Sequence, residues 1–224
     1  MSDPQPRRPM MIAHRYGNDL ALLAAAVAAG ADYVETDIRP YRGRLDVRHA
    51  KTLGPLPIIW DRWYVRRYPR DPLDLDTVLN ALPKGMGIML DLKGNDPVLP
   101  ELLLAALRRH PDPHPIMISS RFWDYLPSLR DYPGLMLFHS IGTRGQLERV
   151  RPLLDLREND AVCVKYTLLD APTVASLKQQ VSMVSTWGIN DSERLHHAVD
   201  WGVDAIITDE ESIMRQAAAR ASTP

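Results

Sequence analysis

The amino-acid sequence predicts an α/β protein closed as a TIM-type (β/α)8 barrel. Short strand-like segments alternate with helical segments from one end of the chain to the other. Each strand-like segment is a nearly continuous apolar run, which is typical of parallel strands covered on both faces. The length of 224 residues suits such a barrel, because α/β barrels commonly occupy this range as one unit. We therefore expect a single domain over residues 1–224, with residues 1–9 as a flexible N-terminus.

Eight segments are expected to form the barrel strands, because they are short, apolar and rich in β-branched residues. They are residues 10–14, 33–38, 87–92, 115–119, 135–139, 161–166, 182–187 and 205–209. Longer segments with helical periodicity lie between most of them, for example residues 19–30, 98–110 and 192–202. Eight units of this kind at this chain length favour closure into a barrel.

The chain between Ile38 and Gly87 is too long for one crossover connection. Residues 44–50 are expected to form an extra strand that returns toward the site. An irregular loop, residues 55–73, and a helix at residues 75–82 are expected to follow. Long loops in compact barrels are often functional. The aromatic residues of this loop either receive an acyl chain or a sugar, or pack as a plug over the barrel: Trp60, Trp63, Tyr64 and Tyr68.

Composition excludes several classes of protein. The net charge of -1 and the scattered basic residues give no nucleic-acid-binding surface. No stretch approaches the roughly 18 apolar residues of a membrane span. The polar N-terminus lacks the apolar core of a signal peptide, so we expect a cytoplasmic protein. The single cysteine, Cys163, excludes an internal disulfide and lies in an apolar run where a buried, unreactive role is expected.

Polar residues gather where the expected strands end, and in an α/β barrel these ends face the active site. They are His14 and Arg15 on the first strand, Glu35 and Asp37 on the second, Asp91 and Lys93 on the third, His139 on the fifth, Lys165 on the sixth and Trp187 on the seventh. The i, i+2 spacing within each acidic strand puts both members of the pair on one side. Taken singly, any of these residues is as easily structural as functional, since ion pairs such as Asp91 with Lys93 are common at barrel ends.

Three carboxylates converging on one barrel mouth favour a bound cation, and hard oxygen ligands suit Mg²⁺ or Ca²⁺. Two histidines beside them would supply a proton donor and a proton acceptor near neutral pH. Arg15 and Lys93 would then neutralise a phosphate. His139 and Lys165 join the expected substrate-binding residues because of their places at strand ends.

The arrangement resembles the glycerophosphodiester phosphodiesterase superfamily, which also includes the sphingomyelinase D-like phospholipases. The resemblance covers almost the whole chain and follows the family order. Its motifs are His14-Arg15, GADYVETDI at residues 30–38, VRH ending at His49, LDLK at residues 90–93, SSRF at residues 119–122, Trp187 and the closing GVDAIITD at residues 202–209. Together they are a much more specific signal than any one of them alone.

The resemblance implies a metal-dependent phosphodiesterase that cleaves a glycerophosphodiester to glycerol phosphate and an alcohol. It implies that His14 and His49 are the acid/base pair. It also implies that Glu35, Asp37 and Asp91 hold one divalent cation, Mg²⁺ or Ca²⁺. Either histidine remains open as the acid.

The resemblance further implies that Arg15 and Lys93 contact phosphate and that Trp187 borders the substrate pocket. The family's His-Arg-Gly is His-Arg-Tyr here, so we expect the Tyr16 ring to narrow the site. Expected partners are a small phosphodiester or a lysolipid. Two alternatives stay open: a lysophospholipase D or sphingomyelinase D-like enzyme that forms a cyclic phosphate, and an inactive phosphate-binding barrel.

Overall fold

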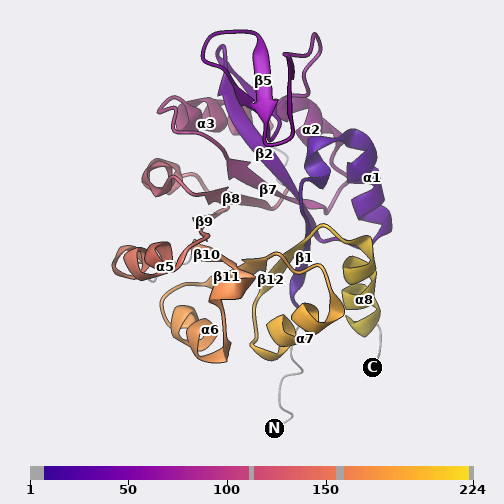
Figure 1. Ribbon diagram of the computed structural model, residues 1–224, viewed down its shortest axis with the longest axis vertical. Coiled ribbons are helices and arrows are strands. Elements are labelled where there is room, and N and C mark those ends of the chain that lie inside the picture. Colours follow the sequence, from indigo (N-terminus) through magenta and orange to yellow (C-terminus); the bar gives the residue numbers. More distant parts are fainter. Residues whose placement is uncertain (1–7, 111–113, 155–158, 222–224) are drawn as a thin grey trace.

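The computed structural model describes residues 8–110, 114–154 and 159–221 of the chain. Within these ranges, eight parallel strands form a closed barrel in the order β1-β12-β11-β10-β9-β8-β7-β2, and pairing of β1 with β2 closes it (Figure 1). The strands are β1 (Met10–Ala13), β2 (Tyr33–Tyr41), β7 (Gly87–Leu92), β8 (Ile116–Ser120), β9 (Leu135–Ile141), β10 (Asp160–Lys165), β11 (Met183–Trp187) and β12 (Ala205–Thr208). The expected barrel is confirmed, and every expected strand overlaps an observed one.

Helices surround the barrel on its outside, as Figure 1 shows. Several begin at a residue whose side chain accepts a hydrogen bond from a free amide of the first turn, for example Asp19, Asp170 and Asp191. The helices are α1 (Leu20–Ala28), α2 (Leu75–Ala81), α3 (Leu99–Arg109), α4 (Leu126–Leu129), α5 (Arg144–Val150), α6 (Ala171–Lys178), α7 (Ser192–Asp200) and α8 (Glu211–Ala221). Short 3-10 turns are η1 (Tyr16–Asn18), η2 (Trp123–Tyr125), η3 (Arg151–Leu153) and η4 (Tyr166–Leu168).

Side-chain alternation along the strands divides the core into an inner and an outer part. Ile12, Met89 and Phe138 belong to a buried cluster that fills the barrel. Their neighbours along the strands, such as Ile88 and Leu137, belong to a separate cluster that packs against the helices. The inner positions continue toward the carboxyl ends of the same strands, so this alternation decides which polar side chains reach the barrel mouth.

The segment between β2 and α2 differs in part from the expectation. The extra strand is confirmed as β3 (Arg44–Val47), which pairs antiparallel with β2. Residues 55–73 are not one irregular loop, because β5 (Ile58–Asp61) and β6 (Tyr64–Arg67) form a hairpin there. With β4 (Lys51–Thr52) they make a three-stranded antiparallel sheet, called here the small sheet.

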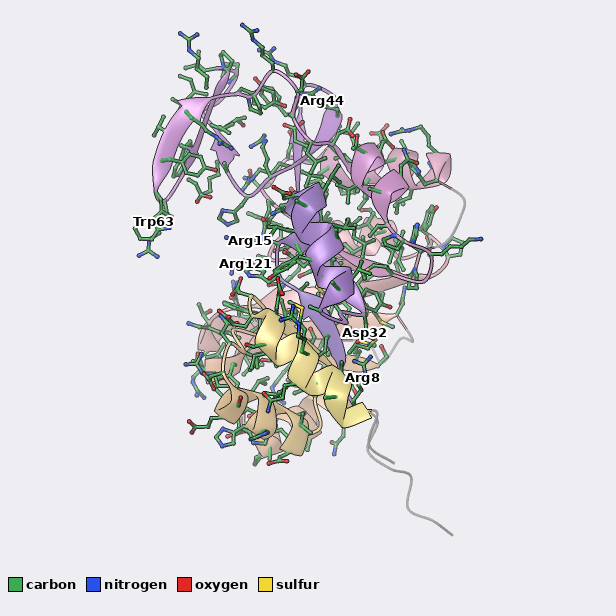
Figure 2. The ribbon with its side chains drawn as sticks, turned by 90° about the vertical axis from the view of Figure 1, so that its right-hand side faces the viewer. Arg8, Arg15, Asp32, Arg44, Trp63 and Arg121 are labelled. Atoms are coloured by element: carbon green, nitrogen blue, oxygen red, sulfur yellow. The ribbon has the colours of Figure 1, made fainter. Side chains whose placement is uncertain are left out.

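The aromatic residues of the small sheet and its flanks do not share one role. Trp60 lines the cavity at the barrel mouth. The ring of Tyr68 packs on that of Tyr41, with centroids 4.5 Å apart. Trp63 lies at the turn between β5 and β6 and is 81% exposed (Figure 2).

Two further expectations concern the chain ends and the membrane. Most of the expected flexible N-terminus, residues 1–7, lies outside the described residues. In the described part of the chain, no helix combines the length and apolar character that a membrane crossing needs.

Gly17 packs where a side chain has no room. A Cβ built on it would lie 1.8 Å from the Thr36 hydroxyl and 3.2 Å from the Glu35 carbonyl oxygen. Gly17 therefore lets η1 lie directly against β2, the strand that carries the acidic residues of the site.

We expect Gly17→Ala to lower the free energy of unfolding by about 1–3 kcal/mol, because an added methyl group must displace β2. Thermal unfolding followed by circular dichroism measures the effect. Gly145→Ala is the matched control, since its Cβ would meet nothing within 4 Å and alanine favours its helix α5. Equal melting temperatures for Gly17→Ala and the wild type would contradict the packing argument.

Candidate active site

A cavity of about 960 Å³ lies at the carboxyl ends of the barrel strands and extends under the small sheet. Most of the sequence-predicted site residues line it together: His14, Arg15, Glu35, His49, Asp91, Lys93 and Trp187. Asp37 is fully buried directly behind this wall, where it forms an ion pair with Lys93. The structure thus brings together residues from both ends of the chain and from the segment after β2.

The acidic residues Glu35, Asp37 and Asp91 form a tight cluster in which one oxygen of each lies within 4.8 Å of the others. Their closeness follows from strand register, because Asp37 of β2 pairs directly with Asp91 of β7. Burial, together with repulsion from Asp37, raises the pKa of Glu35 to about 8. The buried Oδ1 of Asp91 has no hydrogen-bond partner among the described residues. Oxygen donors, close spacing and an unpartnered carboxylate oxygen fit a divalent cation.

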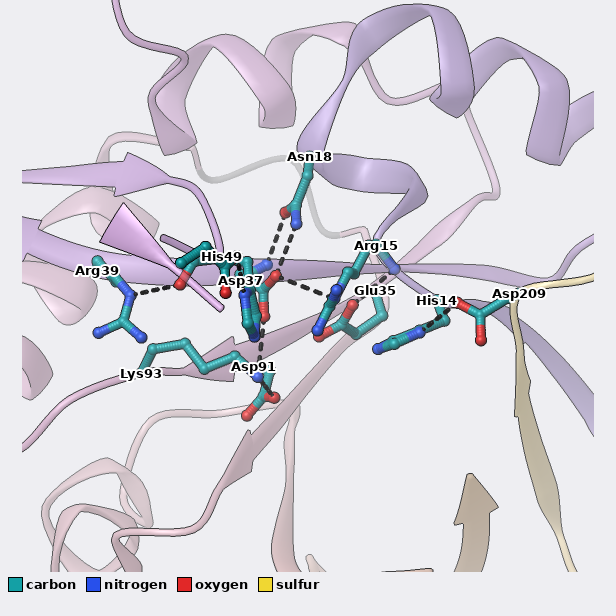
Figure 3. Close-up of polar contacts among 11 residues, drawn as sticks. His14, Arg15, Asn18, Glu35, Asp37, Arg39, His49, Asp91, Lys93 and Asp209 are labelled. Atoms are coloured by element: carbon teal, nitrogen blue, oxygen red, sulfur yellow. Dashed lines mark hydrogen bonds and ion pairs between the residues drawn. The ribbon is translucent and has the colours of Figure 1, made fainter. Parts of the chain in front are cut away.

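Neighbouring groups hold this cluster in place (Figure 3). The Lys93 ammonium donates to Asp91 and forms an ion pair with Asp37 at 2.9 Å. The side-chain amide of Asn18 donates to Asp37 Oδ2 at 2.7 Å, and its oxygen accepts from the Asp37 amide at 2.8 Å. Burial works to lower the pKa of Lys93, but the two aspartates outweigh it and raise that pKa.

Arg15 takes a backbone conformation that side chains rarely adopt. Its φ of 62° lies in the left-handed region, which costs energy for a residue other than glycine. In this conformation its backbone amide donates to Glu35 Oε2 at 2.7 Å. Its guanidinium also lies 3.6 Å from Asp37. The strained residue therefore positions one carboxylate while presenting a cation to the cavity.

Each of the two histidines is paired with an aspartate through Nδ1. His14 Nδ1 donates to Asp209 Oδ1 at 2.6 Å, and His49 Nδ1 donates to Asp61 Oδ2 at 2.6 Å. An ionised carboxylate only accepts hydrogen bonds, so both imidazoles carry their proton on Nδ1 when neutral. Nε2 of each ring is then the atom available to a ligand.

The two histidine–aspartate pairs also shift the pKa values of some of their members. Burial works to lower the pKa of His14, but the hydrogen bond to Asp209 and the charge of Glu35 outweigh it and raise that pKa. Burial works to raise the pKa of Asp61, but the hydrogen bond from His49 outweighs it and lowers that pKa.

Two predicted substrate-binding residues do not line the cavity. The expected place of His139 in the substrate pocket is corrected by the structure. Phe138 fills the barrel and Ser140 lines the cavity, so the alternation of side chains along β9 turns His139 outward. It is only 4% exposed, and its Nδ1 lies 3.3 Å from the Ala161 carbonyl oxygen. Lys165 is not among the residues that line the cavity. Its ammonium lies 5.9 Å from the ring centroid of Trp187, which does line it.

Tyr16 also departs from the expectation, because its ring does not line the cavity. Its hydroxyl instead donates to the Asp209 carbonyl at 3.3 Å. The next residue, Gly17, is the position without room for a side chain, because it packs against β2.

Several residues of the site were not singled out from the sequence. Asp209 stands at the end of the last strand motif, so strand-end reasoning had a signal for it. Asp61 had none, because its contact with His49 depends on the small sheet. Arg39 continues the inner positions of β2, lines the cavity and donates from Nε to the His49 carbonyl at 3.0 Å. Arg121, which follows β8, also lines the cavity.

Comparison with known proteins gives one family and a set of similar folds. Residues 88–211 match the model of the glycerophosphoryl diester phosphodiesterase family. No curated protein sequence matches the chain. The structure is similar to a phosphodiesterase from Oleispira antarctica in complex with the product sn-glycerol-3-phosphate, with a TM-score of 0.74, 20% identity and coverage of 94% of this chain and 97% of that chain.

Two further solved structures are similar. A glycerophosphodiester phosphodiesterase from Thermotoga maritima has a TM-score of 0.67, 20% identity and coverage of 93% of this chain and 97% of that chain. One from Agrobacterium tumefaciens has a TM-score of 0.68, 16% identity and coverage of 94% and 99%. At these identities the likeness shows a shared fold.

The acidic cluster generates a prediction about metal binding. Titration calorimetry with Mg²⁺ and with Ca²⁺ should show one site, and Asp91→Asn should weaken it at least about tenfold, the loss that even outer partners of metal ligands show. Asp96→Asn is the control, because Asp96 follows the same strand but lies outside the cluster. Absence of heat with both cations in the wild-type protein would remove the metal site.

The pairing of His14 with Asp209 generates a prediction about ionisation. Replacing Asp209 by Asn removes the charge that holds the pKa of His14 up, so the imidazole should lose its proton at lower pH. NMR titration of the His14 ring measures this directly. The control is Asp76→Asn, which removes the carboxylate from a different histidine, His110. An unchanged His14 titration in Asp209→Asn would show that Asp209 does not set its pKa.

Proposed function

The chain belongs to the glycerophosphoryl diester phosphodiesterase family, a family of phosphoric diester hydrolases, and we propose that it cleaves a glycerophosphodiester to glycerol phosphate and an alcohol. One observation carries the proposal: two histidines, each oriented by an aspartate, share a cavity with a carboxylate cluster that fits a cation. In Figure 3 Glu35 of that cluster is drawn between His14 and His49.

The two imidazoles suit proton transfer at the two reacting oxygens. One Nε2 accepts the proton of the attacking hydroxyl, and the other imidazole donates its proton to the oxygen that leaves phosphorus. In-line displacement puts these oxygens on opposite sides of phosphorus, which requires two separate groups. Asp209 and Asp61 keep each ring in one tautomer, and Asp209 also stabilises the imidazolium form of His14.

A divalent cation, Mg²⁺ or Ca²⁺, would be held by Glu35, Asp37 and Asp91, and when bound it would draw charge from the phosphoryl oxygens. Arg15 and Lys93 present positive charge to the same cavity and would bind the non-bridging oxygens. Trp187 would border the organic part of the substrate.

Glycerol phosphate as the product is supported by the Oleispira antarctica phosphodiesterase, whose structure holds sn-glycerol-3-phosphate. We also propose that the whole chain works as one domain. The first barrel strand pairs with the last, Met10 with Ala205, so neither end of the described chain closes the barrel without the other.

The proposed function predicts metal-dependent release of glycerol phosphate. Glycerophosphodiesters and lysophospholipids incubated with Mg²⁺ or Ca²⁺ should yield product, and EDTA should abolish the reaction. ³¹P NMR separates hydrolysis, which gives a phosphate monoester, from transphosphorylation, which gives a cyclic phosphate. An absence of turnover across this panel with either cation would support an inactive barrel instead.

The acid/base pair predicts large losses on substitution. His14→Ala and His49→Ala should each lower kcat by about 10²–10⁴-fold, the usual contribution of general acid–base catalysis. His196→Ala is the control, because His196 is exposed on α7 outside the cavity. The variant that loses the acid should recover on a substrate with a good leaving group. Near-normal rates for either variant on a poor leaving group would exclude that histidine from the pair.

A further inference from the structure

Two cationic side chains lie beside the indole ring of Trp187. The guanidinium carbon of Arg121 is 5.7 Å from the ring centroid, and the ammonium of Lys165 is 5.9 Å from it. Tryptophan faces receive quaternary ammonium groups in choline sites. Here the protein's own cations already occupy the surroundings of the ring, so a choline head group would meet like charge.

The rest of the cavity wall has an excess of positive charge. Its cations are Arg15, Arg39, Lys51, Arg62, Lys93 and Arg121, and its carboxylates are Glu35, Asp61 and Asp91. Lys93 and Arg15 form ion pairs with residues of the acidic cluster. No ion pair within the described ranges joins a carboxylate to the other four cations: Arg39, Lys51, Arg62 and Arg121.

Arg121 is the member of this group that lies beside Trp187. It follows β8 directly, two residues after Ser119, whose Cα pairs with that of Asp91 in the acidic cluster. It also contacts Trp187, the residue expected to border the substrate. In the view of Figure 2, Arg121 is drawn below the small sheet, toward the barrel. A group bonded to the phosphorus held at the cluster therefore comes within reach of this guanidinium.

We propose that the cavity selects diesters whose alcohol carries its own carboxylate or phosphate, that Arg121 binds this second anion, and that choline and ethanolamine diesters are poor substrates. The inference rests on the proposed function and narrows its substrate class. A phosphodiester brings one negative charge, which is fewer than the unpaired cations of the wall. A guanidinium binds carboxylate and phosphate through paired hydrogen bonds, and the concentrated positive field of a cleft attracts such ligands.

Three diesters of glycerol phosphate test this selectivity, with glycerate, glycerol or choline as the alcohol. The glycerate and glycerol compounds differ only by a carboxylate in place of a hydroxymethyl group. We expect kcat/KM for the glycerate diester to exceed that for the glycerol diester by about tenfold, a difference in transition-state free energy of about 1.4 kcal/mol. The choline diester should be the slowest, and the preference should weaken with added salt.

Arg121→Gln should reduce the preference for glycerate over choline by at least about tenfold. Arg149→Gln is the matched control: its guanidinium also lies over a tryptophan, 5.8 Å from the Trp123 ring centroid, but it does not line the cavity. The control should keep the wild-type order of substrates.

Dissociation constants of the same diesters, measured by calorimetry on His14→Ala, give a readout that does not need turnover. Equal values of kcat/KM, or a preference for choline, would overturn the inference and leave the proposed function standing. A wild-type preference in Arg121→Gln would overturn the role of Arg121. If no diester is cleaved, the proposed function fails, and the dissociation constants alone decide whether the cavity selects the anionic compound.

Discussion

Mutual repulsion among Glu35, Asp37 and Asp91 is the constraint around which the site is arranged. The β2 and β7 register brings the carboxylates together in a mostly buried corner, where charges interact strongly. Lys93 and Asn18 offset the repulsion at Asp37, and the pKa of Glu35 rises instead. Under the proposed function, a divalent cation and an anionic substrate would complete this balance, and the charges that repel one another would then bind the ligand.

Much of the site follows from alternation along strands of known direction. Glu35, Asp91 and His14 were predicted correctly as cavity residues because each sits at an inner position near a strand's carboxyl end. His139 shows the limit of the same reasoning. Its strand was placed correctly, but one position along a strand reverses the direction of the side chain. Phe138 was the indicator, since a phenylalanine inside the barrel puts the next residue outside.

The partners of the histidines were harder to predict for a different reason. Asp209 follows β12 and contacts His14, which follows the neighbouring strand β1 from the other end of the sequence. Asp61 reaches His49 only because residues 58–67 form a hairpin. The Trp-, Tyr- and Pro-rich sequence around that hairpin has little periodicity. Its strands depend on each other and on contacts with the barrel, which one local segment does not reveal.

The two histidines of the proposed acid/base pair are held by parts of the structure that differ in local stability. His14 and Asp209 flank paired strands of the closed barrel, whereas Asp61 belongs to the small sheet, in which Ile59 is the one buried residue among β4, β5 and β6. Segments with so little buried apolar surface open at a lower free energy than the global unfolding of the protein. Heat or denaturant would therefore release His49 from its aspartate while the barrel stays folded. Amide exchange in β5 and β6 would precede exchange in the barrel strands, and inactivation would precede the cooperative loss of structure.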